Sequence, residues 1–311
     1  MTDKSTAIIF HHYDISPFSE KVRVAFGIKG LDWYAVEQPV IMPKPELTAL
    51  TGGYRKIPVM QIGADVYCDT QLILAELEQR FPTPSLFVGG DHALGWGLGM
   101  WTDRTLFQAA VAIIFGSAGD AVDVAFKQDR EKLMGRPFDT EQMKTAVPVM
   151  KEQLRAQLDW LETQLTDKRP YLMGDQAGIA DVNAYYNLAF IRWIAPEGTQ
   201  LIDKFNEVTR WESRIKAIGH GQRTEMSREE ALDIAKAATS TELPRQDHDE
   251  PNGLKPGDRV TIMADDYGRD PISGELVSSS AQRIAIKRND PRVADVTIHF
   301  PRVGFWVIKQ A

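Results

Sequence analysis

Hydrophobic and polar residues follow three different patterns along the chain. Over residues 1–84, short apolar runs alternate with runs of helical spacing, and this arrangement predicts an α/β domain. Over residues 85–240, apolar residues recur every three or four positions, which predicts an all-helical domain. A polar linker with prolines follows at 241–256, and residues 257–311 then show the alternation of half-buried strands. The sequence therefore predicts three domains.

The same patterns predict the individual elements. In the first domain, strands are expected at 7–10, 33–36, 55–62 and 66–68, and helices at 20–28 and 71–81, with a helix or a loop between the second and third strands. In the second, helices are expected at 95–114, 121–133, 140–165, 179–193, 201–218 and 228–239. In the last, short strands are expected at 259–264, 272–278, 282–288, 296–300 and 304–308. These last strands predict a small antiparallel β-barrel that closes its own core.

The junction between the first strand and the first helix carries the clearest candidate for chemistry. Pro17 suits the first helical turn, because its missing N–H would be unpaired there anyway, and this makes Ser16 the N-cap. A hydroxyl and free backbone donors then lie at the positive end of the helix dipole, which favours anions and lowers the pKa of a nearby thiol. Neither Ser16 nor Ser19 is cysteine, so the thiol must come from a ligand. A lone Ser-Pro pair is more simply a helix cap.

Two further segments follow Ser16 in the first domain. Pro58 lies inside a predicted strand, so it is expected at a sheet edge or after a cis peptide bond. Asp69 and Thr70 begin the helix at 71–81, where backbone donors and the dipole suit a carboxylate. In order and spacing, the three segments resemble the glutathione S-transferase family. The segment 174–182, at a predicted helix start in the second domain, extends the resemblance.

The resemblance implies a thioredoxin-like first domain, an all-helical second domain and glutathione as co-substrate, without a metal. Ser16 would hold the glutathione sulfur as a thiolate, and Tyr13 is the rival donor, since a tyrosine does this in other branches of the family. A cis bond before Pro58 would leave the backbone of Val59 free to pair with glutathione as an extended peptide. The implied glutathione site consists of Lys56, Ile57, Pro58, Val59, Asp69 and Thr70.

The two ends of glutathione need opposite charges. Asp69 and Thr70 suit the γ-glutamyl end, and Asp69 can pair with its amine. Lys56, with Arg55 as a second candidate, suits the glycyl carboxylate. For these charges the competing interpretation is a solvated strand end.

The chain departs from the family pattern at two places. Residues 50–54 stand where the family often has Asn-Pro, which affects the loop beside the peptide site. Gly178 stands where a Ser or Thr usually caps the buried helix of the second domain. Asp181, at the third helical position, is expected to reach back to this cap.

An apolar co-substrate is expected to bind against the helical domain. Its pocket is predicted to include Phe18, Trp101, Arg104 and Phe107. Aromatic residues at helical spacing belong to the core more often than to a pocket. Arg104, the one charged residue of this set, is the strongest candidate for a contact with the co-substrate.

Composition narrows the classes of function. The net charge of −7 argues against nucleic acid as the main partner. Cys68 is the single cysteine, so an internal disulfide is excluded. Six histidines lack ligand spacing, and neighbouring His11 and His12 on a strand face opposite ways, which argues against a metal site. With no basic and apolar leader, and with Asp103 and Arg104 interrupting the apolar run at 96–116, a cytoplasmic protein without a membrane span is expected.

Two hypotheses of different classes follow. The first is an enzyme, expected to be a homodimer, that adds the glutathione thiol to an apolar electrophilic small molecule. The second is a non-catalytic protein of the same fold that binds a protein partner through the cleft or the C-terminal barrel, with Ser16 only a helix cap. The segments at Lys56, Pro58 and Asp69 favour the first hypothesis, and the appended strands at 257–311 favour the second.

Overall fold

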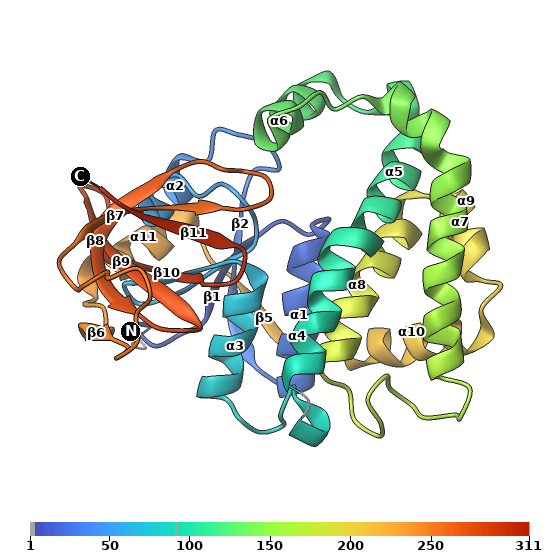
Figure 1. Cartoon of the computed structure of the whole chain (residues 1–311), viewed down its shortest axis with the longest axis horizontal. Helices are drawn as coiled ribbons and strands as arrows, with labels where there is room; N and C mark the ends of the chain where they lie inside the picture. The colour runs from blue at the N-terminus through green and yellow to red at the C-terminus, as the bar shows by residue number, and fades with distance from the viewer. Residues whose placement is uncertain (1–3, 91, 311) are drawn as a thin grey trace.

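A computed structural model describes residues 4–90 and 92–310. It shows a β-rich body and a helical body side by side, with the C-terminal strands on the far side of the β-rich body (Figure 1). Helix α6 lies apart from the other helices, at the top of the view between the two bodies (Figure 1).

The first domain is thioredoxin-like, as expected. Its elements are β1 (Ile9–His12), α1 (Pro17–Lys29), β2 (Asp32–Glu37), α2 (Pro45–Thr51), β3 (Val59–Ile62), β4 (Asp65–Cys68) and α3 (Thr70–Arg80). The strands lie in the order β2, β1, β3, β4; β1 is parallel to β2, and β3 is antiparallel to both of its neighbours. Helix α2 lies in the segment where the sequence pattern allows either a helix or a loop.

The second domain is helical, also as expected. Its helices are α4 (His92–Trp101), α5 (Phe107–Ala118), α6 (Val124–Met134), α7 (Thr140–Gln164), α8 (Ile179–Ile194), α9 (Pro196–Ile202) and α10 (Asn206–Ile218). Short helical turns occur at η1 (Val88–Gly90), η2 (Thr102–Leu106) and η3 (Gly119–Ala121). The helix predicted at 95–114 is divided by η2, a π-helical turn. The helix predicted at 201–218 is replaced by α9 and α10.

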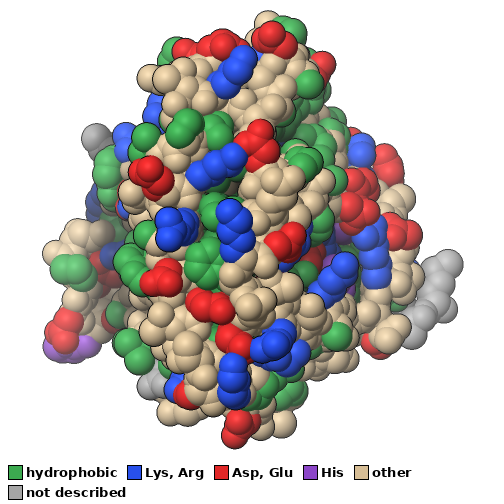
Figure 2. Space-filling view, turned by 90° about the vertical axis from the view of Figure 1, so that its right-hand side faces the viewer, with side chains coloured by type: hydrophobic (Ala, Val, Ile, Leu, Met, Phe, Trp, Pro, Cys, Tyr) green, Lys and Arg blue, Asp and Glu red, His purple; other side chains and the backbone are tan. Residues whose placement is uncertain are grey.

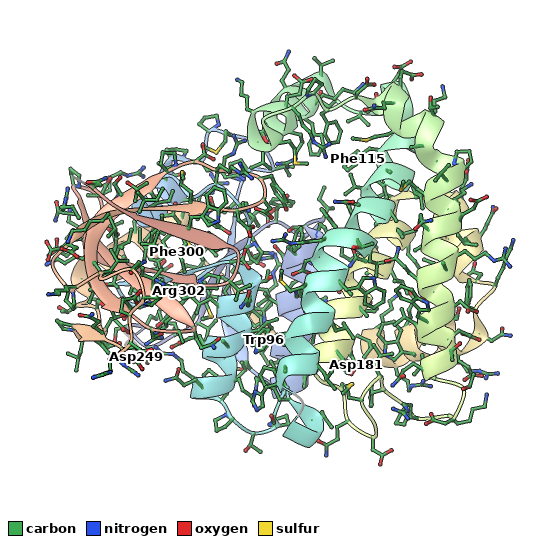
Figure 3. All side chains as sticks on the ribbon, in the orientation of Figure 1. Trp96, Phe115, Asp181, Asp249, Phe300 and Arg302 are labelled. Atoms are coloured by element: carbon green, nitrogen blue, oxygen red, sulfur yellow. The ribbon has the colours of Figure 1, made fainter. Side chains whose placement is uncertain are left out.

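The start of α8 explains the glycine that departs from the family pattern. A Cβ on Gly178 would lie 2.6 Å from the carbonyl oxygen of Leu86, so a larger cap residue would displace the backbone. Asp181 accepts a hydrogen bond from the Gly178 N–H at 2.9 Å, as predicted. Its other oxygen accepts from the Leu172 N–H and the Trp211 indole N–H. Asp181 therefore joins three segments at the base of the helical body (Figure 3).

After α10 the chain returns to the first domain. Strand β5 (Gln222–Glu225) pairs in parallel with β2, and α11 (Arg228–Ala237) packs against α2 and β10. The sequence pattern predicts a helical domain over 85–240, and these bounds place both elements in the second body. The structure places them on the first, because the pairing partner of β5 lies nearly 190 residues earlier in the chain.

The C-terminal strands extend the sheet of the first domain. They are β6 (Arg245–Gln246), β7 (Arg259–Ala264), β8 (Ile272–Ser279), β9 (Arg283–Asp290), β10 (Ala294–Pro301) and β11 (Phe305–Lys309). Consecutive strands from β7 to β10 are antiparallel neighbours, β11 returns to pair with β7, and β10 pairs in parallel with β4. The strands predicted in this region are confirmed. The predicted closed barrel is wrong, since over the described residues these strands form an open sheet continuous with that of the first domain.

The core is shared in the same way. One buried cluster combines residues of β1, α1 and α3 with residues of the helical domain. A second combines Leu47 and Leu50 of α2 and Val66 of β4 with Ile298 and Phe300 of β10. Phe300 lies inside the C-terminal sheet (Figure 3). The C-terminal strands therefore do not close a core of their own.

The surface of the helical domain carries both signs of charge. Lys and Arg side chains alternate with Asp and Glu over this face (Figure 2). Several are paired, including Lys168 with Glu207 at 2.6 Å. Over residues 4–90 and 92–310, no helix is long and apolar enough to cross a membrane.

Candidate functional site

Ser16 caps α1, as the sequence predicts. Its Oγ accepts a hydrogen bond from the Ser19 N–H at 3.2 Å, and Pro17 is the first helical residue. The Ser16 side chain is buried. The hydroxyl therefore lies at the positive end of the helix dipole, away from bulk water, where a hydrogen bond to an anion gains strength.

Tyr13 and Ser16, the rival thiolate donors, are in contact with each other. Burial raises the pKa of Tyr13, and a hydrogen bond with Ser16 and the charge of Arg130 act in the opposite direction. The ammonium group of Lys44 lies 5.9 Å from the centroid of the Tyr13 ring. Because the two hydroxyls are linked, a substitution at one affects the other.

Lys44 is a functional candidate that the sequence analysis missed. Its side chain is buried, and its Nζ donates to the carbonyl oxygen of Arg55 at 3.3 Å. Burial, together with the positive charge of Arg130, lowers the pKa of Lys44 to about 8. A ligand carboxylate beside Nζ would stabilise its charged form. A lysine before a helix gives no sequence signal for this.

The peptide bond before Pro58 is cis, as one of the two predicted alternatives requires. Strand β3 begins at the next residue, Val59, which lies opposite His11 on one side and Cys68 on the other. Val59 is fully buried in the second core cluster. The expectation that its backbone is free to pair with an extended peptide is therefore wrong, because both of its sides face strands of the same sheet.

Asp69 caps α3 in an unusual backbone conformation. Its φ is +78°, which typically costs a residue other than glycine roughly 1–3 kcal/mol. Its Oδ1 accepts from the Gln71 N–H at 3.1 Å. Burial raises the pKa of the Asp69 carboxyl, and the charge of Lys56 opposes this shift. An ammonium group of a ligand would oppose it in the same way.

Most of the predicted site residues meet at one cavity of about 100 Å³ between the two bodies. The predicted residues that line it are Phe18, Lys56, Ile57, Pro58, Asp69, Thr70 and Arg104. Ser16, Val59, Trp101 and Phe107 are not among the lining residues. Residues that sequence reasoning missed also line it, among them Tyr54, Gln71, Met100 and Asp103.

Of the three predicted aromatic residues, Phe18 lines the cavity, Phe107 packs behind Phe18, and Trp101 does neither. Phe18 contacts Phe107, with ring centroids 4.8 Å apart, so Phe107 supports the cavity wall from behind. Trp101 donates its indole N–H to Gln157 and packs against Trp160 of α7, with centroids 5.5 Å apart. Trp101 is therefore directed toward α7, and its contacts are those of a core residue.

Asp103 fixes the wall that the helical domain contributes. Its carboxylate accepts from Lys21 of α1 at 2.8 Å and from the Tyr186 hydroxyl at 2.9 Å. These three hydrogen bonds connect α1 of the first domain to η2 and α8 of the helical domain. The sequence signal was a pair of charges, at Asp103 and Arg104, within an apolar run.

The C-terminal region also reaches this cavity, which the sequence analysis did not anticipate. Asp265, Asp266 and Tyr267, from the connection between β7 and β8, line it together with residues 303–305. Asp266 pairs with Lys56 at 2.7 Å, and Asp265 pairs with Arg104 at 3.0 Å. The sequence pattern places these residues only between two predicted strands, at 259–264 and 272–278.

The other candidates for chemistry have structural partners. Burial raises the pKa of Cys68 well above its usual value, so its thiol stays protonated. His12, Asp14 and Glu37 each offer a ligand atom, and these atoms lie within 4.8 Å of one another. Arg23 contacts His12 Nδ1 at 3.1 Å and Arg223 pairs with Asp14 at 2.6 Å, so both ligands are already used by guanidinium groups.

Comparison with known proteins agrees with this geometry. The family model "Glutathione S-transferase, N-terminal domain" matches residues 10–85, and "Glutathione S-transferase, C-terminal domain" matches residues 114–214. Glutathione S-transferase U4 of Arabidopsis thaliana is 23% identical over 226 residues, which make up 70% of this chain and 88% of that protein.

Solved structures extend the likeness. A glutathione S-transferase from Rhodospirillum rubrum F11 is 23% identical, with a TM-score of 0.50 over 68% of this chain and 88% of its own, and it shows the fold alone. A GST-like protein from Pseudomonas syringae is 37% identical, with a TM-score of 0.83 over 98% of this chain and 100% of its own. That match includes the C-terminal strands. With both domain models matched in order and a relative that spans nearly the whole chain, this protein belongs to the glutathione S-transferase family.

Proposed function

We propose that this chain is a glutathione transferase of the cytoplasm, which activates the glutathione thiol and adds it to an apolar electrophilic small molecule. The observation that carries the proposal is the convergence of Lys56, Pro58, Asp69 and Thr70 on one cavity at the N-terminus of α3. These residues supply the cation, the strand start and the helix terminus that an extended peptide with charged ends requires.

In the proposed mechanism, glutathione lies along Ile57 and Pro58, which line the cavity, and not along Val59, whose two sides are taken by strands β1 and β4. Thr70 and the first turn of α3 receive its γ-glutamyl carboxylate, Asp69 receives its amine, and Lys56 receives its glycyl carboxylate. The thiol proton leaves to solvent, and Ser16 donates a hydrogen bond to the thiolate that remains. The thiolate sulfur then forms a bond to the electrophilic carbon of the second substrate. In an addition, the π electron pair at that carbon moves to the neighbouring atom, which takes up a proton from solvent. With an aryl halide, the halide ion leaves with the electron pair of its bond to carbon.

The second substrate is proposed to bind against the aromatic wall. Phe18 lines the cavity and Phe107 supports it, while Arg104 contributes a cation at the edge. An electron-poor apolar compound suits such a wall, and the guanidinium can receive negative charge that develops on it. Trp101 is not part of this proposal, because its contacts are with α7.

The test is the pKa of the bound thiol. A free thiol of this kind has a pKa of about 8.5, and lowering it by about two units requires roughly 2.7 kcal/mol. We expect Ser16→Ala to raise the pKa of bound glutathione by about one to two units and to slow transfer roughly tenfold to a hundredfold. Ultraviolet absorbance of the thiolate follows the titration directly, and an aryl halide assay follows the rate.

Two variants serve as controls for Ser16→Ala. Ser19→Ala makes the same change one helical turn later, at a buried hydroxyl that has no hydrogen-bond partner among the described residues, and it should leave the titration unchanged. Tyr13→Phe tests the rival donor. If Tyr13→Phe abolishes the thiolate while Ser16→Ala leaves titration and turnover intact, the role assigned to Ser16 is wrong. If the wild type forms no thiolate, the chain is not a transferase of this kind.

We also propose that the protein acts as a homodimer, which the family likeness supports. Light scattering on the full chain should then give twice the mass of one chain. A single-chain mass at micromolar concentration would contradict this.

A further inference from the structure

The connection between β7 and β8, residues 265–271, enters the cavity that the proposed function assigns to glutathione. Asp266 Oδ1 lies 2.7 Å from Lys56 Nζ. The ring centroid of Tyr267 lies 4.3 Å from the same nitrogen. The cation proposed for the glycyl carboxylate of glutathione is therefore already paired with a carboxylate of its own chain.

The same loop is attached to the opposite wall of the cleft. Asp265 pairs with Arg104 of the helical domain at 3.0 Å. The Gly268 N–H donates to the carbonyl oxygen of Leu133, at the end of α6, at 2.7 Å. Gly268 has a φ of +62°, a backbone conformation that favours glycine, and a Cβ there would lie 2.9 Å from Lys56 Cε.

The remaining space is too small for a tripeptide. With the loop in place the cavity measures about 100 Å³, whereas sites for small molecules usually begin at about 300 Å³. Tyr267 is placed among the charges of the site: burial raises its pKa, and Asp266, Asp69 and Asp103 add to the effect. Tyr267 therefore shares the cavity with both the cation proposed for one end of glutathione, Lys56, and the acid proposed for the other, Asp69.

We propose that residues 265–268 are an intramolecular competitor of glutathione, which holds the cleft closed until a ligand carboxylate replaces Asp266 on Lys56. This inference rests on the proposed function, because it takes Lys56 as part of the glutathione site. The carboxylate of Asp266 occupies the position of the glycyl carboxylate, and Tyr267 occupies the space of the peptide.

The contacts that hold the loop are suited to displacement. In each ion pair one side chain is well exposed, Asp266 at 36% and Arg104 at 46%, while its partner is less so, Lys56 at 13% and Asp265 at 29%. Because salt screens the exposed side of each pair, a ligand with both ends bound can replace them. The flanking strands β7 and β8 remain paired with each other, so the loop can move without unfolding the sheet.

Calorimetry with reduced glutathione tests the proposal on the full chain. We expect the double variant Asp266→Asn/Tyr267→Ala to bind glutathione roughly tenfold more tightly than the wild type. Asp270→Asn removes the same charge from an exposed position of the same loop and should bind like the wild type. Lys56→Ala should weaken binding in both the wild-type and the opened background.

The outcomes separate this inference from the proposed function. If wild type and double variant bind glutathione equally, the loop is not a competitor, but the proposed function stands. If only the double variant binds, both are supported. If neither binds, both are overturned.

A second measurement needs no substitution and guards against a variant that misfolds. Backbone hydrogen exchange at residues 265–268 of the wild type should become faster when glutathione is added. Slower exchange would show that the loop closes over the ligand as part of the site, and this would overturn the proposal.

Discussion

Both edge strands of the thioredoxin-like sheet, β2 and β4, pair with a strand from a later part of the chain. The two added strands, β5 and β10, differ in how far their side chains are buried. Strand β5 pairs with β2 and has four exposed residues of the sequence Gln-Arg-Thr-Glu. Strand β10 pairs with β4, and its last six residues are buried. Both strands protect an edge from pairing with another molecule. Only β10 adds apolar residues to the core, so the same backbone pairing serves two different purposes.

The polar contacts at the two edges differ in the same way. At the β4 edge, Asp65 is buried and lies 2.9 Å from Nε2 of His299, whose ring stacks on Tyr67. At the β2 edge, Arg223 pairs with Asp14, which is 61% exposed. A buried hydrogen-bonded carboxylate is costly to disturb, while a surface pair contributes little. Substitutions at the β4 edge should therefore have larger effects than those at the β2 edge.

The largest effect is expected for Phe300→Ala. Phe300 is fully buried, and its ring centroid lies 5.9 Å from that of Tyr54 and 5.4 Å from that of Phe305. Removing such a side chain typically costs about 3–5 kcal/mol of unfolding free energy. Because the core is shared, urea unfolding followed by fluorescence and by circular dichroism should show one transition at lower urea. Two separate transitions would contradict a common core.

Trp306→Ala is the matched control. It removes an aromatic side chain from the same sheet, but Trp306 is 50% exposed and its ring contacts Arg269. We expect a loss near 1 kcal/mol or less. An equal loss in both variants would mean that burial of Phe300 is not what distinguishes the β4 edge.

The difference between the two edges also explains which strands could be predicted from the sequence. Strands β7 to β11 were predicted within one or two residues, because apolar alternation reports which face of a strand is buried. The alternation does not report the partner of that face. A closed barrel and an extension of the first sheet bury the same residues of β10, so the pattern could not distinguish them.

Strand β5 had no signal at all. All its residues are exposed, so it lacks the apolar positions from which a strand is predicted.

One departure from the family pattern is a signal for the C-terminal strands. Tyr54, where the family often has Asn-Pro, contacts Phe300 and Phe305, and a Cβ on neighbouring Gly52 would meet the Arg288 side chain at 2.1 Å.

The candidate site was likewise predictable from the sequence only where the signal is local. The three segments around Ser16, Pro58 and Asp69 were predictable because each has a local backbone requirement: an N-cap, a proline within a strand and a helix start. The loop at Asp266 was not, because its partner Lys56 is 210 residues away and an acidic turn is common on surfaces.

An intermediate effect is expected at Asp65. Burial alone would raise the pKa of its carboxyl, but hydrogen bonds from His299, Ser240 and Thr241 outweigh it and lower the pKa below its usual value. The folded protein therefore gains stability from the carboxylate above the unfolded pKa of about 3.9, and loses it as the pH falls through the lower folded pKa. Asp65→Asn should cost about 1.5–3 kcal/mol at pH 7.

The pH dependence distinguishes this contribution from a packing defect. The difference in unfolding free energy between wild type and Asp65→Asn should be constant from pH 7 to about pH 5 and should shrink below pH 4. Asp249→Asn, at a side chain that is 94% exposed, is the control and should change little at any pH. A difference for Asp65→Asn that is independent of pH would show that the charge of the carboxylate is not involved.

The smallest effect is expected for Arg223→Ala, at the β2 edge. Arg223 bridges Asp14 at 2.6 Å and Glu225 at 2.7 Å, and its guanidinium lies 5.8 Å from the Trp33 ring centroid. Because both carboxylates are more than 60% exposed, the loss of unfolding free energy should be below about 1 kcal/mol. Urea unfolding at low and at 1 M salt measures it, and the difference from wild type should diminish at high salt because exposed charges are screened.

Arg292→Ala sharpens the contrast between the edges. Arg292 pairs with Glu46 of α2 at 3.2 Å, on the side of the sheet where β10 pairs with β4. The Arg292 side chain is 43% exposed, so this pair reaches the surface. It should cost as little as Arg223→Ala, since the β4 edge owes its stability to the buried face of β10 and to Asp65. If Arg223→Ala alone lowered the unfolding free energy nearly as much as Phe300→Ala, strand β5 would contribute as much to the stability of the fold as β10. The proposed difference between the two edges would then be wrong.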